Sequence, residues 1–125
     1  MMKFVFDENV PPKIAYALKA LGKDACPYFE HWPKGARDLE WIPHASAKGW
    51  CIVTSDRLRH PYERAALRQH NARIILLTTR NLQIWDQVRL VINRWEQIEA
   101  TAAKEKPPFI FRFTPRSTKG QRIDF

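Results

Sequence analysis

Two short apolar segments that end at acidic residues constrain the fold of this chain more than any other feature. Residues 4–6 are Phe-Val-Phe and lead directly to Asp7, and residues 50–54 are Trp-Cys-Ile-Val-Thr and lead through Ser55 to Asp56. Runs of this length, rich in aromatic and β-branched residues, predict strands that are buried on both faces. Such strands belong to parallel sheets covered by helices, so we expect an α/β fold with an acid at the end of each strand.

Helical periodicity follows the first of these strands. Residues 11–22 begin with two prolines, end at a glycine and place apolar residues through Leu21 on one face, as expected of a helix of about three turns. Asp38 lies at or just before the N-terminus of a second helix. Because proline lacks an N–H group, Pro43 is expected near the start of that helix.

The rest of the chain continues the alternation of strands and helices. Residues 24–35 favour a weak edge strand and a loop, and residues 73–78 predict a third buried strand. Pro61 begins another helix, with residues 65–67 expected on its inner face, and residues 84–102 carry the clearest amphipathic pattern. The order predicts a three-layer α/β/α fold with a mostly parallel central sheet.

A change of composition after residue 103 suggests where the main domain ends. We predict an α/β domain over residues 1–103 and a basic C-terminal extension over residues 104–125. Within the extension, Phe109–Phe113 is apolar and is expected to form an added strand before a polar tail. If exposed, that segment would dock a partner or pair as an edge strand.

Charge and cysteine content narrow the classes of protein that remain. The 125 residues carry a net charge of +8, and the segments on either side of the Asp56–Arg57 bond contribute zero and +8. Either a polyanionic partner such as nucleic acid or a solvated basic surface accounts for this surplus. No apolar run approaches the roughly 20 residues of a membrane span, and the N-terminus lacks a signal-peptide pattern. Cys26 and Cys51 are expected to be buried thiols, so we expect a cytoplasmic protein.

The acids at the strand ends predict a cation site. Carboxyl ends of parallel strands meet at one edge of the sheet, so Asp7 and Asp56 are expected to lie close together. Their repulsion would be relieved by a hard divalent ion such as Mg²⁺. Asp38 would add a third oxygen ligand, and Glu8 or Glu40 a fourth. For a single acid, helix capping, a turn or solvent exposure is the competing explanation.

The spacing of these motifs resembles that of a known family. The chain contains Asp7-Glu8-Asn9-Val10-Pro11-Pro12, then Asp38-Leu39-Glu40-Trp41-Ile42-Pro43, then the Thr-x-Asp sequence that ends at Asp56. Over roughly residues 3–100 this resembles the PIN-like domains, which include VapC-like toxin ribonucleases. The resemblance implies an endoribonuclease dependent on Mg²⁺ or Mn²⁺, with Asp7, Asp38 and Asp56 as metal-binding acids and a cognate antitoxin protein as partner.

The chain departs from the family pattern at one place. PIN nucleases commonly carry a fourth acid soon after the Thr-x-Asp aspartate, whereas residues 57–60 here are Arg-Leu-Arg-His. Glu63, in the first turn of the Pro61 helix, is the nearest substitute, although the helix dipole also explains an acid there. A catalytically reduced RNA- or protein-binding module therefore stays as the alternative function.

Basic residues close to Asp56 are candidates for contacts with RNA. Arg57, Arg59 and Arg64 flank the acid and would counter the charge of an approaching phosphate backbone. A response-regulator receiver is a weaker alternative, because such a domain needs a strand directly before its lysine, and the residues before Lys106 continue a helix. A homodimer is left open.

Overall fold

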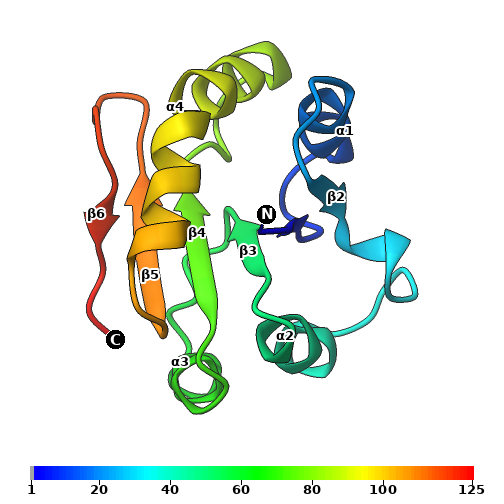
Figure 1. The fold of residues 1–125 in the computed structure, drawn as a ribbon, viewed down its shortest axis with the longest axis vertical. Coiled ribbons are helices and arrows are strands. Elements are labelled where there is room, and N and C mark those ends of the chain that lie inside the picture. The colour runs from blue at the N-terminus through cyan, green and yellow to red at the C-terminus, as the bar shows by residue number, and fades with distance from the viewer. Residues whose placement is uncertain (1) are drawn as a thin grey trace.

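The computed structural model describes residues 2–125, which form one mixed sheet flanked by helices (Figure 1). In chain order the elements are β1 (Phe4–Phe6), α1 (Pro12–Ala20), β2 (Ala25–Pro27), the 3-10 turn η1 (Tyr28–Glu30), α2 (Asp38–Ala47), β3 (Cys51–Thr54), α3 (Pro61–Gln69), β4 (Arg73–Leu77), α4 (Ile84–Lys104), β5 (Phe109–Phe113) and β6 (Gln121–Arg122). The strand order is β2-β1-β3-β4-β5-β6, with β6 antiparallel to β5 and every other pair parallel.

Two hydrophobic cores lie on opposite faces of the sheet. Helices α1 and α4 cover one face, where Trp95 packs edge-on against Phe4 with ring centroids 4.7 Å apart. Helices α2 and α3 cover the other face, with Trp41 and Leu67 in its core (Figure 1). This arrangement confirms the predicted three-layer α/β/α fold.

Some details of the predicted helices were wrong. Leu21 was expected on the inner face of α1, but it is the C-cap residue and is 63% exposed, because the helix ends before it. In α3 only Leu67 is buried, whereas Ala65 and Ala66 were also expected inside. Pro43 lies in the interior of α2 rather than near its start.

The predicted strand at Phe109–Phe113 is present, but it is not exposed. It lies between β4 and β6, and its side chains alternate between the two cores, with Phe113 fully buried. The two-residue strand β6, where the sequence predicted only a tail, covers its outer edge. Because β5 has neighbours on both sides, this segment does not offer a free edge or an apolar docking surface.

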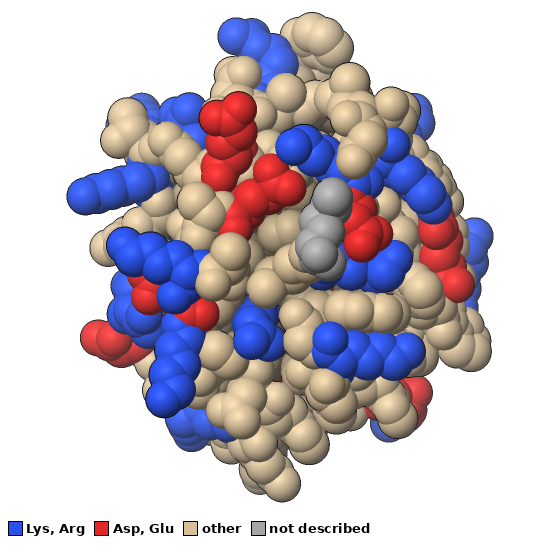
Figure 2. Space-filling view, in the orientation of Figure 1, with Lys and Arg blue, Asp and Glu red and all other residues tan. Residues whose placement is uncertain are grey.

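Surface charge is spread rather than gathered on the face drawn in Figure 2. Lys and Arg side chains are scattered over that face, at its rim and near its middle, with Asp and Glu side chains among them. None of the helices found in residues 2–125 combines the length and the apolar character needed to cross a membrane.

Replacing Phe113 with alanine tests whether β5 is part of the core. Loss of a fully buried phenyl ring is expected to lower the free energy of unfolding by about 3–5 kcal/mol. The control is Trp85→Ala, which removes a 68% exposed ring at the start of α4 and is expected to change stability by less than about 0.5 kcal/mol. Denaturant titration measures both, and equal effects would mean that β5 does not stabilise the fold.

Candidate metal centre

The two strand-end aspartates lie at the same edge of the sheet, as predicted. Strands β1 and β3 are parallel neighbours, and the backbone N–H of Asp7 donates to the carbonyl of Val53 at 3.0 Å. The chain passes from β1 to β2 on one side and from there to β3 on the other, so the strand order reverses at β1. A crevice at such a point is the usual ligand site of open α/β sheets.

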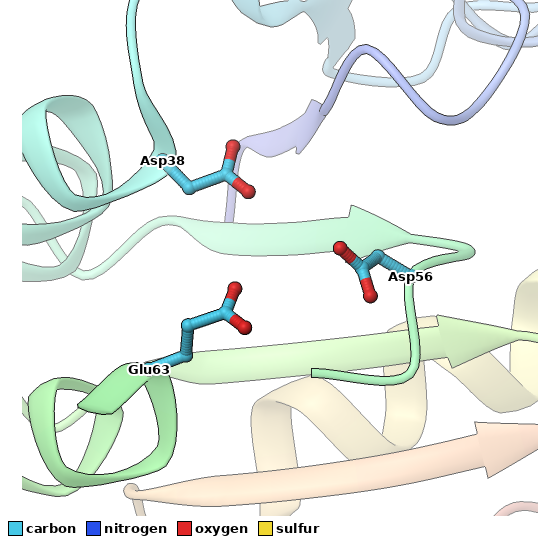
Figure 3. A group of neighbouring side chains, drawn as sticks. All are labelled: Asp38, Asp56 and Glu63. Atoms are coloured by element: carbon cyan, nitrogen blue, oxygen red, sulfur yellow. The ribbon is translucent and has the colours of Figure 1, made fainter. Parts of the chain in front are cut away.

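Three carboxylates converge beside this edge. One oxygen each of Asp38, Asp56 and Glu63 lies within 4.8 Å of the others, and all three residues are partly buried. Figure 3 shows the three side chains pointing toward a common space from the start of α2, from the loop after β3 and from the first turn of α3. The structure thus brings together two of the three predicted primary acids and the substitute at position 63.

The loop after β3 is held in a fixed shape. Leu58 is buried and has a backbone φ of 51°, a left-handed conformation that is unfavourable for leucine. Its N–H donates to Asp56 Oδ1 at 3.1 Å, and its carbonyl accepts from Arg64 Nε at 2.7 Å. These contacts fix Asp56 relative to the first turn of α3, which carries Glu63.

Asp7 is not one of the three converging carboxylates, because it lies deeper in the protein. The residue is 4% exposed, and its Oδ1 accepts a hydrogen bond from the Asn9 N–H at 3.0 Å. Burial raises the pKa of Asp7 to about 7, with a smaller contribution from the charge of Asp38, against hydrogen bonds from Thr54 and Asn9 that lower it. Asp7 is therefore close enough to Asp38 to be affected by its charge, although it does not join the three converging carboxylates.

The pKa of Asp38 is raised as well. Partial burial is the main cause, and the negative charges of Glu8, Asp56 and Glu63 add to it, while a hydrogen bond with Trp41 opposes it. Glu8 thus acts on the cluster through its charge, although it is exposed and is not one of the converging three. Asp38 therefore lies close enough to these three acids for their charges to add to the effect of burial.

Glu40 has a structural role instead. The carboxylate accepts a hydrogen bond from the backbone N–H of Arg37 at 3.3 Å, which caps the N-terminus of α2. The side chain is exposed and does not join the three converging carboxylates. Capping therefore accounts for this acid, which the sequence offered as a fourth ligand.

The donor set fits a hard divalent cation. With ligand distances of about 2.1 Å, oxygens bound to one Mg²⁺ ion lie about 3.0 to 4.2 Å apart. The three carboxylate oxygens lie within 4.8 Å of one another, so small side-chain movements would bring them to one ion. Within residues 2–125, none of the six candidate acids forms an ion pair, since the five ion pairs there use other carboxylates. Carboxylates held together without a counter-charge are what an oxygen-ligated cation requires.

The candidate arginines lie beside the acids without pairing with them. Arg57, Arg59 and Arg64 line a cavity of about 290 Å³ together with Arg112 from β5. A second cavity, of about 510 Å³, borders the acids and is lined by Leu39, His60 and Tyr62 as well as by Asp38 and Glu63.

Two residues near the site were missed in the sequence. The Thr54 backbone belongs to β3, and its hydroxyl accepts the Asp56 N–H at 3.0 Å and also bonds to Asp7, so that it links the two aspartates. The Thr-x-Asp spacing was a signal for this role. Arg112 had no such signal, because only the pairing of β5 with β4 brings it near the loop after β3.

Comparison with known proteins gives one match. Residues 2–79 match the sequence profile of a family described as "PIN like domain". No curated protein and no solved structure matches the chain. The matched segment contains every acid of the cluster and ends just after β4.

The raised pKa of Asp7 predicts how stability depends on pH. Between its usual pKa of 3.8 and about 7, folded Asp7 keeps a proton that the unfolded chain has released, so rising pH lowers the free energy of unfolding. Asp7→Asn removes this effect. In EDTA, the stability of the variant relative to wild type is expected to increase from pH 5 to pH 7, by at most about 1.4 kcal/mol per pH unit.

Thermal melts at successive pH values measure this difference. The exposed Asp86→Asn change serves as the control, and its stability relative to wild type is expected to vary little over the same range. Parallel curves for Asp7→Asn and wild type would show that the carboxyl is ionised throughout.

Proposed function

Because the chain belongs to the PIN-like domain family, we propose that it is a divalent-metal-dependent endoribonuclease that hydrolyses RNA phosphodiesters at the carboxylate cluster. The family and the cluster together indicate a nuclease-type function. The observation that carries the proposal is that Asp38, Asp56 and Glu63 converge within 4.8 Å while none of them forms an ion pair with residues 2–125.

Each acid has a part in this proposal. Asp38, Asp56 and Glu63 would hold Mg²⁺ or Mn²⁺, which when bound polarises a phosphate and lowers the pKa of coordinated water. Asp7 would help to position the site, since the Thr54 hydroxyl links it to Asp56, and once ionised it would add negative charge next to Asp38. A cation would lower the pKa of Asp7 and favour its charged form at neutral pH.

The position of Glu63 favours catalysis over a binding module. The alternative of a catalytically reduced domain rested on the absence of an acid in residues 57–60. The buried Leu58 turns the chain back so that the first turn of α3 places Glu63 beside Asp56. A carboxylate seven residues after Asp56 can thus take the role of the usual fourth acid.

We further propose that the nuclease is the toxin of a cytoplasmic toxin–antitoxin module. The support is the resemblance of its motifs to those of VapC-like toxins. Co-expression with the product of the neighbouring open reading frame is expected to give a complex that co-purifies and does not cleave RNA. Free nuclease activity in the presence of that product would contradict the proposal. Size-exclusion chromatography of the protein alone tests for a homodimer.

Substitution of the cluster tests the nuclease. Asp56→Asn and Glu63→Gln are each expected to lower the rate of Mg²⁺-dependent RNA cleavage by about a hundredfold or more, because each removes a charged ligand. Glu96→Gln is the matched control, because Glu96 is an exposed acid on α4 that forms no ion pair with residues 2–125. This variant should cleave RNA at the wild-type rate. Equal rates in all four proteins would reject the site.

Metal removal gives a second readout that does not depend on turnover. Mg²⁺ at a hundred times its dissociation constant is expected to stabilise the wild-type protein by about 2.7 kcal/mol relative to EDTA. This stabilisation should be lost in Asp56→Asn and kept in Glu96→Gln. Thermal melts with and without the ion measure it, and an unchanged melting temperature in wild type would show that no ion binds.

A further inference from the structure

Four arginines surround one cavity next to the acidic cluster. Arg57 and Arg59 come from the loop after β3, Arg64 from α3 and Arg112 from β5, and the cavity that they line measures about 290 Å³. Thr78, just after β4, adds a hydroxyl to the lining. Arginine presents a planar fork of donors that matches the oxygens of phosphate and carboxylate groups.

These arginines are held near one another without a carboxylate to neutralise them. None of the four forms an ion pair within residues 2–125. The Nε atom of Arg112 is buried and has no hydrogen-bond partner in that range, although its terminal nitrogen donates to the side chain of Gln121. A buried guanidinium donor without an acceptor is costly unless a ligand satisfies it.

The arginines do not pair with the acids of the cluster, although two of them directly follow these acids in the sequence. Arg57 follows Asp56 and Arg64 follows Glu63, yet neither arginine comes within 4.0 Å of a carboxylate oxygen of the described chain. Arg64 Nε donates instead to the carbonyl of Leu58, which draws it away from Glu63. Groups of opposite charge that do not neutralise each other are each available to an external ion of the opposite sign.

We infer that Arg57, Arg59, Arg64 and Arg112 form a pocket for a phosphate group of the RNA, next to the phosphate that is cleaved. The inference rests on the proposed nuclease function, because it assumes that the substrate lies across the acidic cluster. A smaller cavity of about 130 Å³ adjoins the pocket, because Arg57 and Thr78 line both. Arg80, in the loop after β4, also lines this smaller cavity. RNA would thus leave the acids along the carboxyl ends of β3 and β4.

Arg112 is the most specific element of this pocket. It lies on β5, beyond residues 2–79 that match the family, so the family profile alone does not contain the site. The parallel pairing of β5 with β4, in which Arg112 lies opposite Leu76, brings it to the cavity.

Binding measurements without metal test the pocket separately from cleavage. In EDTA, fluorescence anisotropy gives the affinity of the full-length protein for a short single-stranded RNA at several salt concentrations. Arg112→Gln is expected to weaken binding about tenfold at low salt and to reduce the slope of log K against log salt by about 0.7, the value for one lost phosphate contact. Arg116→Gln is the matched control, because this exposed arginine lies outside the pocket.

A second variant guards against misfolding, since Arg112 is partly buried. Arg59 is exposed, and Arg59→Gln is expected to reduce affinity and slope in the same way without affecting the core. Three RNAs of one sequence, with a 5′-phosphate, a 3′-phosphate or neither, distinguish the source of the phosphate. Equal losses on all three identify a backbone phosphate, and a loss confined to one phosphorylated end identifies a terminal phosphate.

Either of these results supports the pocket. The pocket would be rejected if Arg59→Gln and folded Arg112→Gln had the same RNA affinity and salt slope as Arg116→Gln. It would also be rejected if the wild-type protein bound none of the three RNAs. If the acid variants lose cleavage but keep arginine-dependent RNA binding, both the proposed pocket and the proposed nuclease function are supported. If the wild-type protein binds RNA through these arginines but does not cleave it, the proposed pocket is supported and the proposed nuclease function is rejected.

Discussion

Repulsion between carboxylates held at one edge of the sheet is the interaction on which this site depends. Asp38, Asp56 and Glu63 approach one another within 4.8 Å, and the charge of Asp38 also acts on buried Asp7. Burial, and to a smaller extent neighbouring negative charges, raise the pKa of Asp7 and Asp38, so keeping these two carboxylates ionised without a cation costs free energy. Packing in the two hydrophobic cores offsets this free energy, because it holds the strands and helices that carry the acids in place.

The loop between β3 and α3 separates the two kinds of charge. Buried Leu58 has a left-handed backbone conformation. Its N–H donates a hydrogen bond to Asp56, and its carbonyl accepts one from Arg64. Asp56 and Glu63 therefore converge with Asp38 of α2, while the arginines line a cavity with residues of β4 and β5. In the proposed nuclease, this loop would present a surface for a cation beside a surface for an anion, the combination that metal-assisted cleavage of a phosphodiester needs.

Some site residues could be predicted because they occupy fixed places in a strand–helix repeat. Asp7 and Asp56 each follow a buried strand, and Asp38 begins a helix, so their position at one edge of the sheet follows from parallel topology. Glu40 was harder to judge, since a glutamate in a first helical turn serves equally as a cap, and here it does. The burial of Asp7 was also not evident, because sequence periodicity does not indicate how deeply each strand-end acid is buried.

The sequence by itself determined the alternation of strands and helices, the mostly parallel sheet and the acids at its carboxyl edge, because these depend on local periodicity and on the handedness of crossovers. Tertiary structure decided which acids converge, that Glu63 joins them, and that Arg112 faces the loop after β3. It also decided that Phe109–Phe113 is an interior strand, covered by β6. The physical reason is that burial and the distance between charges depend on which segments pack together across the sheet, and no local pattern records those contacts.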